Sequence, residues 1–178
     1  MALQTSGPIS LSQIAGEFGG STPHSLSEYY GVASGIPSSG AISMSQFYGA
    51  ANAAYVYATG GAVNQSGNYR THYFYSSGYF NITNAGNSAG SNSVTYLILA
   101  GGGGGAGIGG GGAGGYRYGS TTVSTGNNYI SVGGGGGGSV STYYYIRGSN
   151  GGNSSALGIT STGGGGGSAQ IEYQGPAS

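Results

Sequence analysis

The sequence predicts a mainly β protein, in which short one-turn helices precede an antiparallel sandwich or jelly-roll-like domain with polyglycine-rich loops. Three observations lead to this fold class. A small capped motif occurs three times before residue 52, strand-like alternation begins near residue 53, and long glycine runs interrupt the strand-like segments. We therefore divide the chain into an N-terminal docking segment, residues 1–52, and a glycine-rich β domain, residues 53–178.

The composition argues against several classes of function. Of 178 residues, 44 are glycine and only 3% are charged, with no Lys and a net charge of zero. Such a chain cannot neutralise a row of phosphates, so we expect no nucleic-acid partner. It has no polybasic segment and no long apolar segment, so we expect no membrane insertion. Cysteine is absent and the first residues show no leader pattern, so we expect assembly in a cytoplasm.

The repeated motif reads as a minimal helix. Its copies are ISLSQIAG at 9–16, HSLSEYYG at 24–31 and ISMSQFYG at 42–49. In each copy a Ser at the second position is a predicted N-cap, and the Gln or Glu three residues later completes a capping box. The final glycine suits a left-handed helix end. The predicted caps, box partners and helix ends are Ser10, Ser25, Ser43, Gln13, Glu28, Gln46, Gly16, Gly31 and Gly49.

A single helical turn is marginal by itself, so these turns must pack on each other, on the β domain or on another protein. The conservative interpretation is that they only pack locally. We favour docking onto another protein, because a repeated apolar unit with little surrounding core usually buries its face on a neighbour. The predicted docking residues are Ile9, Leu11, Ile14, Phe18, Leu26, Tyr29, Tyr30, Ile42, Met44, Phe47 and Tyr48.

After residue 53 the sequence alternates in short segments rich in Tyr, Val, Ile and Thr, separated by Gly, Asn and Ser, which predicts eight or nine strands. The sequence Ser76-Ser77-Gly78 between Tyr75 and Tyr79 predicts a tight hairpin. The predicted strands are 54–57, 69–75, 79–83, 94–100, 116–123, 129–132, 141–147, 156–160 and 168–173.

Four glycine runs lie within this domain, at 101–105, 109–112, 133–138 and 163–167. One interpretation is a set of flexible linkers. Ordering a glycine costs on the order of 0.5–1 kcal/mol more than ordering an alanine, so a fold keeps such runs where backbones must approach closely. We therefore favour extended chains packed in a polyproline-II-like lattice with interchain hydrogen bonds.

Two clusters combine tyrosines with an arginine beside glycine-rich turns. Tyrosine offers a flat apolar face with a hydroxyl, and arginine adds a rigid set of donors, which suits a glycan or a protein receptor. The alternative is that these tyrosines pack in a sandwich with the arginine stacked on them. The candidate receptor-binding residues are Tyr116, Arg117, Tyr118, Tyr143, Tyr144, Tyr145 and Arg147.

Enzymatic chemistry has little support in the sequence. The titratable residues fall in no triad or paired-carboxylate motif, and His24 and His72 have no metal-ligand spacing. The glycine runs lack the Gly-Lys-Ser/Thr ending of a phosphate-binding loop. We therefore expect no enzyme activity, no cofactor and no metal site.

Several segments together resemble the glycine-rich domain of bacteriophage tail-fibre-like proteins: 77–83, 94–105, 112–117, 150–155 and 159–167. Segments 9–19 and 23–31 resemble the N-terminal segment of many phage virion proteins, especially those of marine and cyanobacterial phages, where varied domains follow it.

The resemblance implies a virion component: a tail-fibre, tail-tip or surface-appendage protein that attaches to a host surface. Its partners would be other phage structural proteins and a host glycan or protein. Low charge, glycine runs and many tyrosines suit a tight symmetric interface, and fibres of this kind are often three-fold, so we expect a homotrimer. The alternatives are a purely structural capsid decoration or adaptor protein and, from another class, a secreted ice-binding or matrix protein.

Overall fold

The computed structural model describes residues 2–107, 109–139 and 146–169. Its internal contacts divide the chain into two units. Unit 1 comprises Met1–Tyr57 and Asn84–Ser93, and unit 2 comprises Ala58–Thr83 and Val94–Ser178. The predicted docking segment thus falls wholly within unit 1, which also includes a short segment from the middle of the chain.

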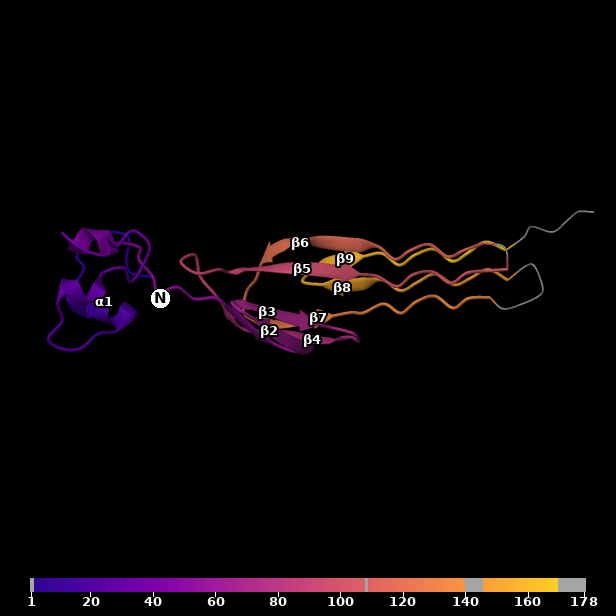
Figure 1. The fold of residues 1–178 in the computed structure, drawn as a ribbon, viewed down its shortest axis with the longest axis horizontal. Coiled ribbons are helices and arrows are strands. Elements are labelled where there is room, and N and C mark those ends of the chain that lie inside the picture. The colour runs from indigo at the N-terminus through magenta and orange to yellow at the C-terminus, as the bar shows by residue number, and fades with distance from the viewer. Residues whose placement is uncertain (1, 108, 140–145, 170–178) are drawn as a thin grey trace, which may run out of the picture. The chain divides into compact units, whose positions relative to one another are not determined.

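Helical structure in the described part of unit 1 occurs at the three motif copies: α1 (Leu11–Phe18), η1 (Leu26–Tyr29) and η2 (Met44–Phe47) (Figure 1). In the first copy the Ser10 amide donates to Gln13 Oε1 at 2.8 Å, and Ser10 Oγ accepts from the Gln13 amide at 3.3 Å. In the third copy the Ser43 amide donates to Gln46 Oε1 at 2.7 Å. These contacts confirm the predicted capping boxes at both sites.

The second copy departs from the prediction. Ser25 occupies the N-cap position, but its hydroxyl makes no capping bond. It lies 2.8 Å from Ser27 Oγ, a contact that the first and third copies also make. Glu28 is drawn away from the cap by His24, whose Nδ1 lies 3.6 Å from Glu28 Oε2. Both His24 and the Tyr29 hydroxyl offer the Glu28 carboxylate a polar partner. The other two copies have apolar residues at both of these positions.

The predicted helix end at Gly16 is also wrong. The α1 helix continues through Gly16 to Phe18 and ends at Gly19, which has φ = 76° and donates its amide to Ala15 O. Gly31 and Gly49 do adopt positive φ after η1 and η2, as predicted. The difference arises because α1 is a full eight-residue α-helix, whereas η1 and η2 are four-residue 3-10 turns.

Unit 1 has its own hydrophobic core, which is built from the same position of each motif copy. Ile14, Tyr29 and Phe47 are almost completely buried and belong to one cluster with Ile36 and Ala50. The rings of Tyr29 and Phe47 meet edge to face, with centroids 6.1 Å apart. The motif copies therefore pack on one another.

The mainly β prediction is confirmed, with 31% of residues in strands, 10% in helices and antiparallel pairing of the sheets. The strands that the structure describes close no barrel, so the jelly-roll form is not confirmed. Their sheets have the orders β1-β4-β7, β2-β3, β5-β6 and β8-β9. The strands are β1 (Val56–Thr59), β2 (Ala62–Ser66), β3 (Tyr69–Tyr73), β4 (Gly78–Ala85), β5 (Ser93–Leu99), β6 (Tyr116–Thr122), β7 (Gly126–Ile130), β8 (Ser154–Ala156) and β9 (Ile159–Ser161).

Two local strand predictions are wrong. The sequence 76–78 does not join a hairpin, because β3 pairs with β2 and β4 pairs with β7. The predicted strand 156–160 is itself a hairpin, in which Ala156 pairs with Ile159 across Leu157 and Gly158. Both turn residues have positive φ, 53° and 77°, as in a type I′ turn. The predicted strands 141–147 and 168–173 lie almost entirely outside the described residues.

Within the described residues, five glycine-rich segments of unit 2 form a lattice of extended chains. We number them in chain order as segment I (100–106), segment II (109–115), segment III (133–139), segment IV (148–153) and segment V (162–167). Figure 1 shows them as undulating traces that adjoin β5, β6, β7, β8 and β9 respectively.

Segment I is hydrogen-bonded to all four of the other described segments, through amide–carbonyl bonds of 2.7–3.0 Å. Each partner recurs every third residue, since the amides of Gly101 and Gly104 both donate to segment IV. This period is that of a polyproline II helix. One bond to each segment shows the pattern: Gly103 donates to Gly112 O, Gly104 to Ser149 O, Gly136 to Gly102 O and Gly164 to Gly101 O.

The lattice requires glycine because carbonyl oxygens occupy the space where side chains would start. A Cβ on Gly103 would lie 2.0 Å from Gly165 O, and one on Gly104 would lie 2.1 Å from Gly137 O. No described glycine of the five segments has a positive φ, in agreement with polyproline II backbone. The predicted lattice is therefore confirmed over the flexible-linker interpretation.

Adjacent glycines in segment V test this packing. A Cβ on Gly164 would lie 2.1 Å from Gly112 O, whereas one on Gly165 meets no atom within 4 Å. Gly164→Ala should therefore lower the free energy of unfolding by about 1–3 kcal/mol through overpacking. Gly165→Ala should leave it unchanged or raise it by about 0.4–1 kcal/mol. Chemical unfolding of the two variants measures the difference, and equal stability would contradict close backbone packing.

The β8–β9 turn makes a second stability prediction. Leu157 has φ = 53°, a conformation that costs an ordinary L-residue about 1–2 kcal/mol and that Asn tolerates better. Leu157→Asn should therefore raise the free energy of unfolding by up to about 1 kcal/mol. Leu157→Ala is the control, because it removes the same apolar side chain without relieving the backbone. Thermal unfolding should rank Asn above Ala, and the reverse order would show that Leu157 contributes more by packing than its backbone costs.

Candidate functional site

The β5–β6 hairpin of unit 2 exposes an apolar face. Leu97 and Leu99 of β5 are 56% and 59% exposed, and Tyr116 and Tyr118 of β6 are 65% and 66% exposed. We call these four residues the hairpin face. Large apolar side chains so open to water on neighbouring strands are typical of an interaction surface.

The strand register brings the four side chains together. The Ala100 amide donates to Gly115 O at 3.0 Å, and Thr95 Oγ1 lies 3.1 Å from Ser120 Oγ. These contacts place Leu97 opposite Tyr118 and Leu99 opposite Tyr116 in the antiparallel pair. Side chains directly opposite each other on one face lie about 4.5–5.5 Å apart at Cβ. The hairpin face is therefore one continuous surface.

The third member of the predicted cluster lies on the other side of the strand. Arg117 alternates with Tyr116 and Tyr118, so its side chain leaves the opposite face of β6, across from the buried Ile98. On that same side Tyr96 covers Gly119, where an added Cβ would lie 2.7 Å from the Tyr96 hydroxyl oxygen. The structure thus joins the two predicted tyrosines with two leucines and separates them from the arginine.

The two strands that carry the hairpin face are continuous with the glycine lattice. Strand β5 runs directly into segment I and segment II runs directly into β6, and the two segments remain paired through Gly103 and Gly112. Both strands are thus fixed at the same end by backbone hydrogen bonds. The hairpin cannot splay without breaking the lattice, so the face is held in one shape before any partner arrives.

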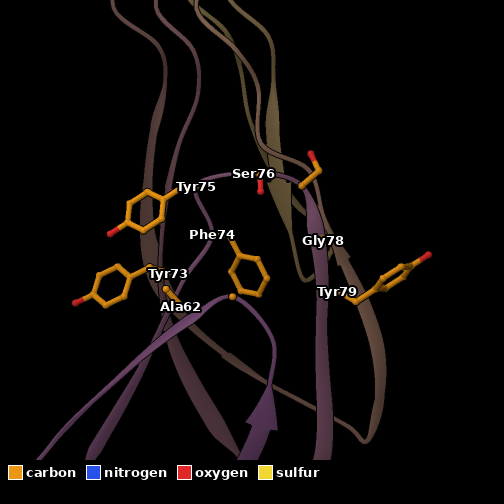
Figure 2. Close-up of a pocket in the computed structure, with 9 residues that line it drawn as sticks. Ala62, Tyr73, Phe74, Tyr75, Ser76, Gly78 and Tyr79 are labelled. Carbon is orange, nitrogen blue, oxygen red and sulfur yellow. The ribbon is translucent and has the colours of Figure 1, made fainter.

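A second group of aromatic side chains borders a shallow depression of about 280 Å³. Figure 2 shows Tyr73 and Tyr75 on one side of the depression and Tyr79 on the opposite side. Phe74 lies in the middle, between the pair and Tyr79. The Tyr73 and Tyr75 rings are nearly parallel, at 5°, with centroids 6.2 Å apart. Sequence reasoning places Tyr73 and Tyr75 in a predicted strand without identifying them as a surface group. The signal that could have shown it is the occurrence of tyrosine at alternate positions.

Residues 76–178, more than half of the chain, match the glycine-rich domain family. The chain belongs to this glycine-rich domain family. No curated protein and no solved structure matched the chain. The glycine-rich domain begins just before β4 and includes both strands of the hairpin face and the described glycine lattice.

The other predicted receptor-binding cluster in the glycine-rich domain is only partly described. Tyr143, Tyr144 and Tyr145 lie outside the described residues, and Arg147 is exposed immediately before segment IV. Among the described residues no group of three or more His, Asp or Glu could hold a metal ion. No helix in the described ranges is long and apolar enough to cross a membrane.

The predicted docking residues of unit 1 fall into three groups by burial. Ile14, Tyr29 and Phe47 form the core and are closed to a partner. Burial, with the adjacent Glu28 carboxylate, raises the pKa of the Tyr29 phenol above its usual 10.0. The exposed member is Tyr48, which like Tyr30 donates its hydroxyl to a loop carbonyl. The half-buried members are Ile9, Leu11, Phe18, Leu26, Tyr30, Ile42 and Met44.

Proposed function

We propose that this chain is a non-enzymatic structural protein of a bacteriophage particle, a tail-fibre, tail-tip or surface-appendage component assembled in the host cytoplasm. Its glycine-rich domain would attach to a host surface through the hairpin face. The observation that carries this proposal is an exposed face of two tyrosines and two leucines on a hairpin whose strands continue into a backbone lattice.

The chemistry of the face supports attachment to a glycan or a protein. Tyr116 and Tyr118 offer flat apolar rings with hydroxyl groups, and Leu97 and Leu99 extend the apolar area onto the neighbouring strand. A pre-formed face loses little conformational freedom on binding, so more of its contact energy appears as affinity. The low charge of the chain leaves shape and apolar contact as the main source of specificity.

Unit 1 supports the second half of the proposal, which is incorporation into the particle. Ile14, Tyr29 and Phe47 pack together in a core that belongs to unit 1 alone, so this unit can act as a compact adaptor. The equivalent residues Leu11, Leu26 and Met44 stay half-buried around that core. They would supply the apolar contacts to another phage structural protein.

Electron microscopy of labelled particles tests the location. A gold-binding tag on this chain should appear at a few positions at the tail tip or on an appendage. Hundreds of labels over the capsid would instead show a decoration protein with a purely structural role. Absence of the chain from purified particles would contradict any virion function.

Binding to host cells tests the hairpin face. Tyr116→Ser together with Tyr118→Ser should weaken cell binding of the purified protein at least tenfold, because each truncated aromatic anchor costs about 2 kcal/mol. The matched control is Tyr69→Ser with Tyr75→Ser, which removes two tyrosines that are 81% and 82% exposed elsewhere in unit 2. Circular dichroism checks that both variants fold. Loss of binding in the control alone would assign attachment to the aromatic group beside the β3 strand.

A further inference from the structure

Segment I is surrounded on only part of its circumference. Hydrogen bonds connect segment III to IV, IV to V and V to II, so these four described segments form a continuous arc around segment I. Segments II and III are the ends of the arc, since no backbone hydrogen bond joins them among the described residues. The arc therefore leaves one side of segment I uncovered between segments II and III.

The uncovered side carries backbone groups without lattice partners. Within the described residues, the amides of Gly102 and Gly105 donate to no carbonyl. The carbonyls of Ala100 and Gly103 lie against Gly114 and Gly111 at the segment II border of this side, and within the described residues they accept from no amide. All the other amides from Ala100 to Ala106 are hydrogen-bonded. These free donors and acceptors repeat every third residue, which is the period of the bonds that hold the rest of the lattice. Backbone groups of this kind are obligate hydrogen-bonding groups.

The glycines that border the uncovered side leave room for added atoms. A Cβ on Gly102 or Gly105 would approach segment II no closer than 3.6 Å, and one on Gly135 or Gly138 would lie 3.7 or 3.5 Å from segment I carbonyls. Gly105, Gly135 and Gly138 are exposed and Gly102 is half-buried. We call the channel between these four glycines the lattice groove.

We propose that the lattice groove binds an extended glycine-rich segment of a second copy of this chain, which adds to the arc as a further lattice chain. The free groups match a partner that offers carbonyls and amides every third residue at the spacing of the existing chains. Only a chain without side chains at the contact can approach that closely, because at packed lattice positions such as Gly103 and Gly104 an added Cβ would lie about 2 Å from a carbonyl oxygen.

Two further observations favour a second copy as the occupant. The chain contains several such glycine runs, so each copy carries both the groove and candidate segments to fill it. Its charged residues amount to 3% with zero net charge, so two copies meet without electrostatic repulsion. This mode of association is the lattice counterpart of adding a strand to an open sheet edge. It does not depend on attachment to a host.

The test compares three double variants by sedimentation equilibrium across a wide concentration range. Gly102→Ala with Gly105→Ala places two methyl groups in the groove without an internal clash. Gly134→Ala with Gly137→Ala adds two methyl groups to the same lattice where nothing lies within 4 Å. Gly135→Ala with Gly138→Ala obstructs the groove from its other wall and serves if the first variant fails to fold.

The unmodified chain should sediment as a homo-oligomer of its 17.2 kDa monomer. The groove variants should associate at least tenfold more weakly at an unchanged melting temperature, and the Gly134/Gly137 variant should associate like the unmodified chain. If the unmodified protein is monomeric, the proposal is overturned. This holds both for an empty groove and for a groove filled by a segment of the same molecule. Undiminished association of folded groove variants would also overturn it, and neither result bears on host attachment.

Discussion

The structure of unit 2 depends on a backbone contact that only glycine permits. In the lattice, carbonyl oxygens of one segment lie where the Cβ of the next would be, as Gly165 O does beside Gly103. This approach brings amides and carbonyls of neighbouring chains within hydrogen-bonding distance and adds Cα–H···O contacts of modest strength. The entropic cost of ordering glycine is offset by satisfying most of the amides and carbonyls in a compact array. These segments therefore form a core of backbone, to which Asn150 and Asn153 add side-chain bonds from the Gly166 and Gly163 amides.

Unit 1 is stabilised by the opposite means. Its core consists of large side chains, with Ile14, Tyr29 and Phe47 brought together from successive copies of one motif. Each copy is a turn or two of helix, too short to persist alone, and becomes stable because its buried residue contacts those of the other copies. Capping boxes at Ser10 and Ser43 fix where two of the helices begin, and at the second copy the His24–Glu28 contact replaces the box.

How far the sequence predicts this fold depends on which force dominates locally. The capped turns and most strands follow from propensity, side-chain spacing and cap chemistry, which act over a few residues. The glycine runs predict a lattice, but they carry no side-chain pattern that would set its order of chains. The partners of β3 and β4 depend on long-range pairing, so the hairpin expected at 76–78 did not form. The strand predicted at 156–160 was wrong because Leu157 adopts a left-handed backbone conformation, which an L-residue with a branched side chain disfavours.

The candidate site shows the same limit and its physical reason. Tyr116 and Tyr118 are recognisable in the sequence as a pair on one side of a strand, and alternation alone places Arg117 on the other side. Leu97 and Leu99 join them only through the register of β5 and β6, which the bond from Ala100 to Gly115 extends into the lattice. The lattice therefore does more than support the hairpin. By fixing which residues of β5 and β6 are opposite each other, it determines the composition of the exposed face. The composition of that face and the packing of the glycines therefore follow from one register.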